Sequence, residues 1–396
     1  MRHPVLTTSW LVMVACVIGP LAVKGHAPII RTGGDDNNDP AAAPDRGGGG
    51  RFSCGLIRAE ELGFSHAWFY DTQMLCADCF VAMGAAAVQT SRIRLGTGVL
   101  IPTNRIAPVT ANALASLNQL APGRIDFGVG TGFTGRRTMG LGAMKQSDME
   151  EYIRVVMALL DGETPEFEIE GRCQKITFLN PELKLINLRD EVKLHVSAYG
   201  PRGRALTARL GAGWLNFVGD VTSGVAAMRA MQQSWDKAGN DMTDLTAVAF
   251  ALGCVLQPGE PADSERAMAQ AGPRAAVLLH RAADEALTGL PNTSPIPPEL
   301  AEPVAAYVEL AKAFKPADAR YLANHRGHLM AVKPIERPFV TGEMIRQTTF
   351  TGTEPDLLER IAALRDGGYT QFTVQLVPGQ EAAIEDWARI AGALRA

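Results

Sequence analysis

The sequence predicts an α/β fold in which parallel strands close into a (β/α)8 barrel. Short apolar strands alternate with helices over most of the 396 residues, and this alternation is typical of a parallel sheet covered by helices. Eight such units form a TIM barrel. A helix candidate at 56–62 precedes every clear strand and therefore requires a further strand before it. The seven strand candidates span 66–70, 93–99, 125–129, 192–197, 213–217, 245–255 and 371–377.

The first 50 residues differ in composition from the rest of the chain. The apolar run at 10–23 is short for a membrane span. It fits a signal-peptide core, a buried strand or a wrongly assigned start, and these alternatives stay open. Residues 33–50 are rich in Gly, Asp, Asn, Pro and Ala, which predicts a flexible linker. We expect 1–50 to be an atypical, partly disordered extension that supplies the first strand from 11–18 or 28–31.

Helix candidates separate the strands, and two of them carry start signals. Pro108 stands in the first turn of 108–120, where proline is favoured. Ser147 and Glu150 have the spacing of a capping box at the start of 147–160. The other helix candidates of the barrel span 79–89, 200–210, 221–237, 264–287, 355–366 and 382–394.

Two stretches interrupt the alternation of strands and helices. Residues 167–179 alternate apolar and polar side chains around Gly171, which predicts an inserted hairpin. The segment at about 290–350 contains a proline-rich piece, a helix at 299–314 and an irregular basic part. We therefore expect one barrel domain over 51–396, with this helical and irregular insertion before the last strand.

Composition limits the class of protein. Apolar residues make up 46% and charged residues 20%, which suits a globular enzyme with a sizeable core. A net charge of −4 argues against a nucleic-acid partner, which would require a basic excess. Six cysteines are too few for a disulfide scaffold in a chain of this length. A reducing, cytoplasmic location is the simplest expectation.

The glycine-rich loop after strand 125–129 is the first candidate binding element. Glycines at 128, 130, 132, 135 and 140 let the main chain turn at positive φ or approach a ligand closely. In an α/β protein, a loop of this kind at the end of a strand usually faces the cofactor. Phe133 stands where the dinucleotide fingerprint requires its third glycine, so a Rossmann interpretation is rejected. A loop that only connects two elements is the alternative.

Four segments resemble the luciferase-like monooxygenase superfamily and occur in that family's order. They are AEELGFSHAW at 59–68, IRLGTGV at 93–99, GRIDFGVG at 123–130, and SAYGP at 197–201 followed by ARLGAGW at 208–214. The resemblance implies a TIM barrel that binds FMN or the deazaflavin F420 at its C-terminal mouth. It is closest to the F420-dependent, methylenetetrahydromethanopterin reductase-like branch. Family members open with a clean first strand near Met1, and this sequence departs from that pattern.

The resemblance also implies roles for individual residues. Asp71 would act as the catalytic residue that sets the cofactor ring or a substrate proton; alternatively, it caps the following turn. A non-proline cis peptide is implied at Gly98–Val99, with Thr97 at the ring edge. The helix start near Gly200 would offer free N–H groups to a phosphate. The implied cofactor-binding set is Thr97, Gly98, Val99, Thr131, Gly132, Phe133, Ala198, Tyr199, Gly200, Pro201 and Arg202.

Three further patterns are weaker functional signals. The CxxC at 76–79 has no second pair and is not expected to bind a metal or act in redox chemistry. His325 and His328 lie three residues apart in the insertion, without an adjacent third ligand in the sequence. His66 and His195 fall within apolar strands and are interpreted as histidines of the barrel interior. No metal site is therefore expected.

The leading functional hypothesis is an F420-dependent oxidoreductase that transfers a hydride between the deazaflavin and a small organic substrate. In such enzymes the cofactor supplies the hydride chemistry and the protein supplies orientation and electrostatics. One alternative is an FMN-dependent monooxygenase that uses O2 and reduced flavin from a partner flavin or F420 reductase. Another is a barrel without catalytic activity. The resemblance also implies a homodimer.

Overall fold

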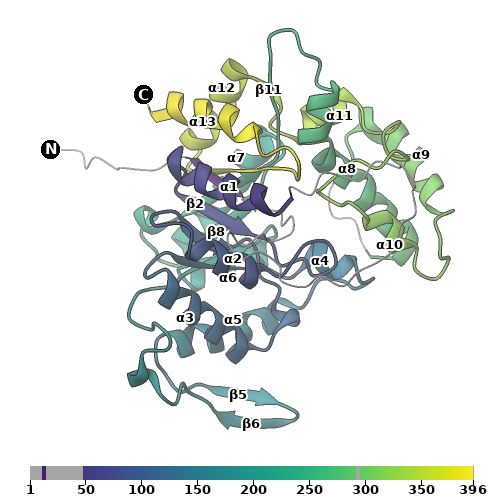
Figure 1. Ribbon diagram of the computed structural model, residues 1–396. Helices are drawn as coiled ribbons and strands as arrows, with labels where there is room; N and C mark the ends of the chain where they lie inside the picture. Colours follow the sequence, from purple (N-terminus) through teal and green to yellow (C-terminus); the bar gives the residue numbers. More distant parts are fainter. Residues whose placement is uncertain (1–10, 15–47, 291–294, 396) are drawn as a thin grey trace, which may run out of the picture.

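The protein is a closed barrel of eight parallel strands, as the sequence predicts (Figure 1). The computed structural model describes residues 11–14, 48–290 and 295–395. Around the barrel the strands follow the order β1-β12-β9-β8-β7-β4-β3-β2. Their bounds are β1 (Leu11–Val14), β2 (His66–Phe69), β3 (Arg94–Thr97), β4 (Ile125–Val129), β7 (Lys193–Ser197), β8 (Gly213–Phe217), β9 (Ala247–Ala251) and β12 (Gln371–Gln375).

The first strand comes from the N-terminal extension and closes the barrel. β1 pairs with β12 from Leu11↔Phe372 to Val14↔Gln375, and it meets β2 at Met13↔Ala67. It therefore corresponds to the candidate at 11–18. The other candidate, the rest of the apolar run and most of the expected linker lie outside the described residues.

A ring of helices covers the strands, and the main core lies between the two layers. Inside the barrel, Trp68, Leu215, Val248 and Phe250 form a separate buried cluster that fills the space below the mouth. Among the described residues, no helix has both the length and the apolar character needed to cross a bilayer. The covering helices are α1 (Gly48–Glu61), α2 (Cys79–Ala87), α3 (Ala107–Leu120), α5 (Gln146–Leu160), α6 (Pro201–Arg209), α7 (Val221–Lys237), α12 (Glu354–Asp366) and α13 (Ala383–Arg395).

Between β9 and α12, the chain forms a helical unit beside the barrel (Figure 1). α8 (Glu265–Thr288) packs against α9 (Ala301–Ala311), α10 (Arg320–His325) and α11 (Gly342–Thr348). These helices share a hydrophobic core of their own. The limits of the insertion expected at about 290–350 stay a prediction. Helix α8 comes before residue 290 in the sequence, yet it packs with the helices of that segment.

Two local predictions were wrong. The strand expected at 245–255 ends at Ala251, because Gly253 brings the chain so close to Phe350 that a Cβ there would lie 1.8 Å from the Phe350 carbonyl oxygen. The chain then forms the short β10 (Val255–Leu256), which pairs with β11 (Gly352–Thr353).

The capping box expected at Ser147 is also absent. Lys145 is the N-cap of α5, and the Ser147 hydroxyl bonds to the Asp148 carboxylate instead. A capping box forms at the start of α12, between Thr353 and Asp356. The predicted hairpin exists as β5 (Glu166–Ile169) and β6 (Arg172–Lys175), and it projects from the barrel (Figure 1).

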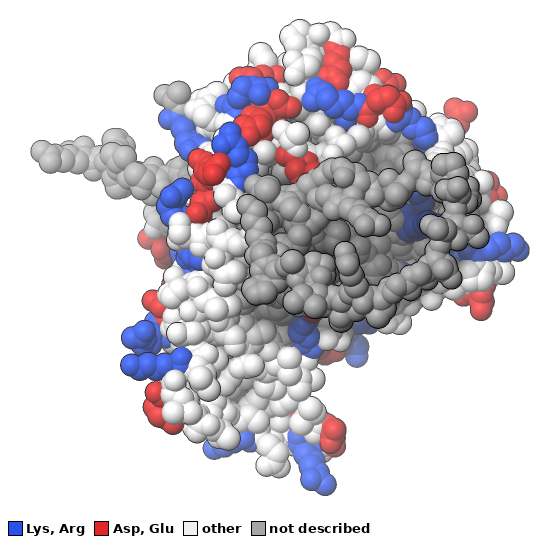
Figure 2. Space-filling model, viewed as in Figure 1, with Lys and Arg blue, Asp and Glu red and all other residues white. Residues whose placement is uncertain are grey.

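Charged side chains of both signs are mixed on the face of the molecule that Figure 2 shows. On the face seen in Figure 2, the described basic and acidic residues lie interspersed, without a broad basic area outside the grey atoms. This distribution agrees with the net charge of −4.

Candidate functional site

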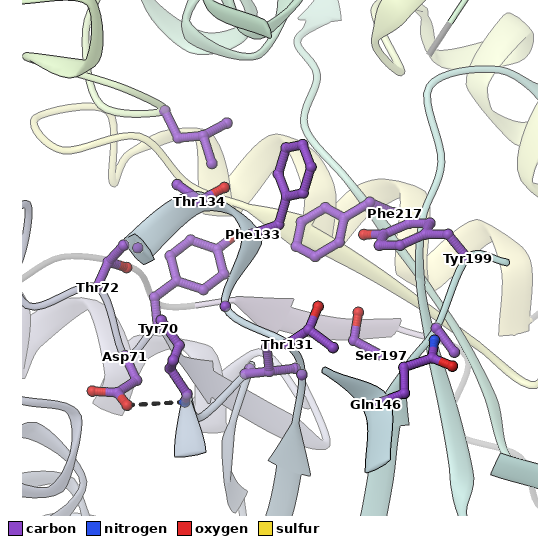
Figure 3. A pocket seen from close by; sticks show the side chains of 18 of the residues that line it. Tyr70, Asp71, Thr72, Thr131, Phe133, Thr134, Gln146, Ser197, Tyr199 and Phe217 are labelled. Carbon is purple, nitrogen blue, oxygen red and sulfur yellow. Dashed lines mark hydrogen bonds between the residues drawn. The ribbon is translucent and has the colours of Figure 1, made fainter. Parts of the chain in front are cut away.

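A cavity of about 240 Å³ lies at the C-terminal mouth of the barrel (Figure 3). The ends of β2, β3, β4, β7 and β8 bring Tyr70, Val99, Thr131, Ser197 and Phe217 to its wall. In a (β/α)8 barrel the functional site sits at this end, because the loops that follow parallel strands all meet there.

The wall of the cavity combines aromatic side chains with hydroxyl groups. The rings of Tyr70, Phe133, Tyr199 and Phe217 surround the cavity, and the close-up shows the hydroxyls of Thr131 and Ser197 directed toward the space between them (Figure 3). Aromatic rings offer flat apolar surfaces, and a few hydroxyls among them fix the orientation of a ligand.

Most of the predicted cofactor-binding residues line this cavity. The predicted residues found in its wall are Gly98, Val99, Thr131, Gly132, Phe133, Ala198, Tyr199 and Gly200. The Gly98–Val99 peptide is cis, as the family resemblance implies. Contact of these residues with a cofactor stays a prediction.

The glycine-rich loop does more than connect two elements. A Cβ on Gly130 would lie 2.8 Å from Val99 Cγ2, and one on Gly132 would lie 2.6 Å from Ile101 Cγ2. Gly132 also has a φ of 77°, a conformation that suits glycine. The glycines let the loop after β4 pack closely on the loop after β3, and this packing forms one wall of the cavity. The loop then continues into α4 (Phe133–Arg137).

Asp71 is buried at the edge of the cavity, but its carboxylate is fully engaged. Oδ2 accepts hydrogen bonds from the Ile101 backbone N–H at 3.0 Å and from the Asn104 amide at 3.1 Å. Oδ1 accepts one from Arg105 Nη1 at 3.0 Å. Its side chain points away from the aromatic rings (Figure 3). These contacts suit a positioning role, in which Asp71 fixes the loop that carries Ile101, and the role expected for Asp71 toward the cofactor ring or a substrate proton stays a prediction.

Three other predicted residues lie outside the cavity wall. Thr97 is buried, and its hydroxyl donates to the Gly128 carbonyl at 2.7 Å and accepts from the Gly128 N–H at 3.0 Å, so it joins β3 to β4. Pro201 and Arg202 are exposed at the start of α6. They can reach only a part of a ligand that extends beyond the cavity.

The sequence analysis missed several residues of the wall. Tyr70, Ser197 and Phe217 stand at or just after strand ends, and that position alone could have identified them. Gln146 comes from the start of α5, and Leu329 comes from the insertion. Neither has a local sequence signal, because only the tertiary fold brings it to the mouth.

A buried polar network lies deeper in the barrel. The Asp126 carboxylate is 2.9 Å from Arg94 Nε, 3.4 Å from His195 Nε2 and 3.8 Å from His66 Nε2. Burial alone would raise the pKa of Asp126, but hydrogen bonds from His195 and Arg94 lower it. Burial lowers the pKa of His66 to about 4, against the opposing effect of Asp126. Both histidines lie in the barrel interior, as interpreted from the sequence.

Helix α8 reaches the site through Phe133. The guanidinium of Arg137 lies 3.9 Å from the centre of this ring, and that of Arg281 lies 5.1 Å from it. Arg137 Nη1 is 2.7 Å from Asp284 Oδ2, so this ion pair joins α4 to α8. Burial, together with the nearby Arg281, lowers the pKa of Arg274 to about 10. Two guanidinium groups therefore pack against Phe133, and one of them, that of Arg137, is paired with Asp284.

The two cysteines of the CxxC motif are packed into the protein structure. Cys76 and Cys79 are not joined by a disulfide; the Cys76 thiol donates to two backbone carbonyls, and Cys79 is buried. Burial raises the pKa of the Cys79 thiol, which keeps it protonated. Among the described residues, no group of three or more His, Cys, Asp or Glu is arranged to hold a metal ion.

The cavity suits the ring portion of a larger cofactor. Its volume of about 240 Å³ falls below the range of roughly 300–1,000 Å³ that is usual for whole ligands. A Cβ on Gly200 would meet no atom of the described residues within 4 Å, so the described wall is open at this glycine, next to the first turn of α6. A ligand that fills the cavity can extend past Gly200.

Comparisons with known proteins support this view of the architecture. The profile of the luciferase-like monooxygenase family matches residues 56–371. An F420-dependent glucose-6-phosphate dehydrogenase of Nakamurella multipartita is 31% identical over 195 residues. That alignment covers 47% of this chain and 54% of the relative, so the chain spans about half the length of this curated relative. A 5,10-methylenetetrahydromethanopterin reductase of Archaeoglobus fulgidus is 26% identical, over 79% of this chain and 85% of its own.

A solved structure has the same fold. The coenzyme F420-dependent tetrahydromethanopterin reductase from Methanopyrus kandleri superposes with a TM-score of 0.64 at 20% identity, covering 85% of this chain and 93% of its own. Since the family profile extends over most of the sequence and the barrel agrees with it, the chain belongs to the luciferase-like monooxygenase family.

Proposed function

We propose that this protein is an F420-dependent oxidoreductase that transfers a hydride between the deazaflavin and a small organic substrate. The observation that carries the proposal is the cavity at the barrel mouth, which joins flat aromatic walls to the hydroxyls of Thr131 and Ser197. The names of two relatives in sequence also support the proposal. One is an F420-dependent glucose-6-phosphate dehydrogenase, and the other is a 5,10-methylenetetrahydromethanopterin reductase.

Each wall has a distinct part in this proposal. F420, when bound, supplies the hydride chemistry. Val99 and Phe133 would contact the faces of its ring, and Thr131 and Ser197 would hydrogen-bond its polar edge. Asp71 would keep the loop at Ile101 in place. The free N–H groups at the start of α6 would receive a phosphate of the tail.

Predictions about partners and location remain open. A homodimer, a partner reductase that supplies reduced cofactor, and a cytoplasmic location are still expectations. An FMN-dependent monooxygenase and a barrel without catalytic activity are the other outcomes against which the proposal is tested.

The test is a titration of the full chain with F420 and, separately, with FMN, in which tryptophan fluorescence reports binding. The protein has five tryptophans, and Trp68 is buried in the cluster inside the barrel. Tight F420 binding with weak FMN binding supports the proposal. The reverse preference identifies a flavin enzyme and calls for an oxygen-consumption assay. Binding of neither cofactor by correctly folded protein contradicts both enzyme hypotheses.

A further inference from the structure

The helical unit beside the barrel contributes one residue to the described wall of the main cavity. That residue is Leu329, which lies in the loop between α10 and α11. The other described lining residues lie at or after strand ends, or belong to α4 and α5. Leu329 therefore reaches the site from a unit that folds around a core of its own.

The backbone of Leu329 has a conformation that is rare for a leucine. Its φ is 63°, in the left-handed region. The other described non-glycine residues with positive φ are Glu170, at the turn of the projecting hairpin, and Lys184, and both are exposed. Leu329 is half-buried. Strain of this kind in a bulky residue persists only where the surroundings hold it, and it concentrates at functional sites.

The surroundings that hold Leu329 come from the last strand of the barrel. Gln375 ends β12 and is buried, and its Nε2 donates to the Leu329 carbonyl at 3.2 Å. Its Oε1 accepts from the Tyr70 hydroxyl at 2.5 Å. On the other side of Leu329, the Met330 N–H donates to the Gly327 carbonyl at 2.9 Å. The loop is therefore fixed to the barrel mouth at the residue that lines the cavity.

The main cavity has two ends. In the close-up, Tyr70, Thr72 and Thr134 lie on one side of the cavity, and Tyr199 lies on the other (Figure 3). Gly200, where the described wall is open, follows Tyr199 in the chain. A cofactor whose tail leaves past Gly200 would therefore have the Tyr70 end as the space farthest from its tail.

Leu329 lies between this end of the main cavity and a second, small cavity of about 20 Å³. Four residues line both cavities: Tyr70, Thr72, Thr134 and Leu329. The small cavity is also lined by Leu75, His328, Met330 and Gln375. Because Leu329 has apolar neighbours there, and because the Gln375 amide is bonded to Tyr70 and Leu329, a shorter side chain at 329 would open space that suits apolar atoms.

We propose that Leu329 sets the size limit for the substrate, and that the substrate is a small alcohol or carbonyl compound with an apolar substituent. The inference rests on the proposed function and names the substrate class of the same site. The substituent would lie at the Tyr70 end of the cavity and pack against Leu329. The positive φ would keep the residue at this wall, so the helical unit would determine which substrates fit.

The first test concerns the conformation of Leu329, and it uses urea denaturation of the full chain without cofactor. Glycine adopts a positive φ without strain, whereas alanine does not. Leu329→Gly should therefore have a higher urea midpoint than Leu329→Ala. The control is Leu322, an exposed leucine in α10, where glycine weakens the helix and the order should be reversed. A Leu329→Gly midpoint below that of Leu329→Ala would overturn the inference.

The second test measures the size limit by binding. The full chain, loaded with F420, is titrated with methyl ketones that carry an ethyl, a butyl or a hexyl chain, and the fluorescence of the cofactor reports binding. Leu329→Ala should bind the hexyl ketone at least about tenfold more tightly than the wild type, since one methylene in an apolar pocket is worth roughly that much. Its affinities for F420 and for the ethyl ketone should change far less. Leu322→Ala should bind all three ketones as the wild type does.

The outcomes separate this inference from the proposed function. If the wild type binds F420 but Leu329→Ala has wild-type affinity for all three ketones, the size limit is overturned and the proposed function stands. If neither F420-loaded protein binds any of the ketones, the substrate class is overturned, again without touching the proposed function. A wild-type protein that does not bind F420 overturns the proposed function, and with it the substrate site that Leu329 would limit.

Discussion

Replacing Asp71 by Asn tests whether this residue acts by positioning the cavity wall. The carboxylate accepts three hydrogen bonds, one of them from the Arg105 guanidinium. An asparagine can keep its oxygen toward Ile101 and Asn104, but its NH2 group then faces Arg105. The variant therefore loses one charge-assisted hydrogen bond, worth about 1.5–3 kcal/mol. Arg105 retains its contact with Asp78, so it is not left unpaired.

We expect Asp71→Asn to lower the free energy of unfolding by about 2–3 kcal/mol, measured by urea denaturation. It should also weaken F420 binding, because the loop that carries Ile101 loosens. Asp78→Asn is the control, since Asp78 shares Arg105 but is half exposed and Asn can still cap α2; its cost should stay below about 1 kcal/mol. An Asp71→Asn variant of wild-type stability that loses turnover would refute the positioning role and support the direct proton role.

Three other perturbations have defined outcomes. Gly132→Ala should lower the free energy of unfolding by about 3 kcal/mol, whereas Gly211→Ala, which also has positive φ but open space around it, should cost about 1 kcal/mol in the same urea assay. Burial lowers the pKa of His66 from 6.5 to about 4, so the unfolded chain takes up a proton first and stability should fall as pH drops from 6.5 to 4; His66→Gln should reduce this loss. Arg137→Met leaves a buried carboxylate without its cation and should cost about 3 kcal/mol, against less than about 0.5 kcal/mol for Arg154→Met in an exposed pair, both measured by urea denaturation.

The barrel could be predicted because each of its units carries a local signal. Strands such as 125–129 are short and apolar, helices such as 108–120 have recognisable starts, and glycines mark the turns between them. The first strand at Leu11–Val14 could only be narrowed to two candidates, since four apolar residues beside a composition-biased stretch fit several structures. Its pairing with β12, at the other end of the chain, is what identifies it.

The candidate site was predictable where it follows the strand ends. Thr131 and Tyr199 lie in loops that the barrel topology must place at the mouth. The directions of side chains were not predictable. The Thr97 hydroxyl turns toward β4, and the Asp71 carboxylate turns toward the next loop, and a sequence does not specify such directions.

The contact between His280 and His328 could not be predicted from spacing. His325 and His328 have no third ligand nearby in the sequence, yet α8 brings His280 to within 2.8 Å of His328. The insertion folds around its own core, and the sequence separation of 48 residues hides this contact. Long-range packing of a helix against a loop therefore accounts for what the sequence analysis missed.

The measurement that tests the central claim most directly is the F420 affinity of Gly200→Leu. Among the described residues, no atom lies within 4 Å of a Cβ at this position, and the φ of −88° suits any residue, so the added side chain enters space at the cavity edge without backbone strain. The matched control is Gly392→Leu, an exposed position in α13 with no atom near its Cβ. The account predicts that Gly200→Leu weakens F420 binding at least tenfold while its melting temperature stays close to that of the wild type, and that Gly392→Leu binds as the wild type does. Wild-type affinity in Gly200→Leu would show that the cofactor does not occupy this cavity.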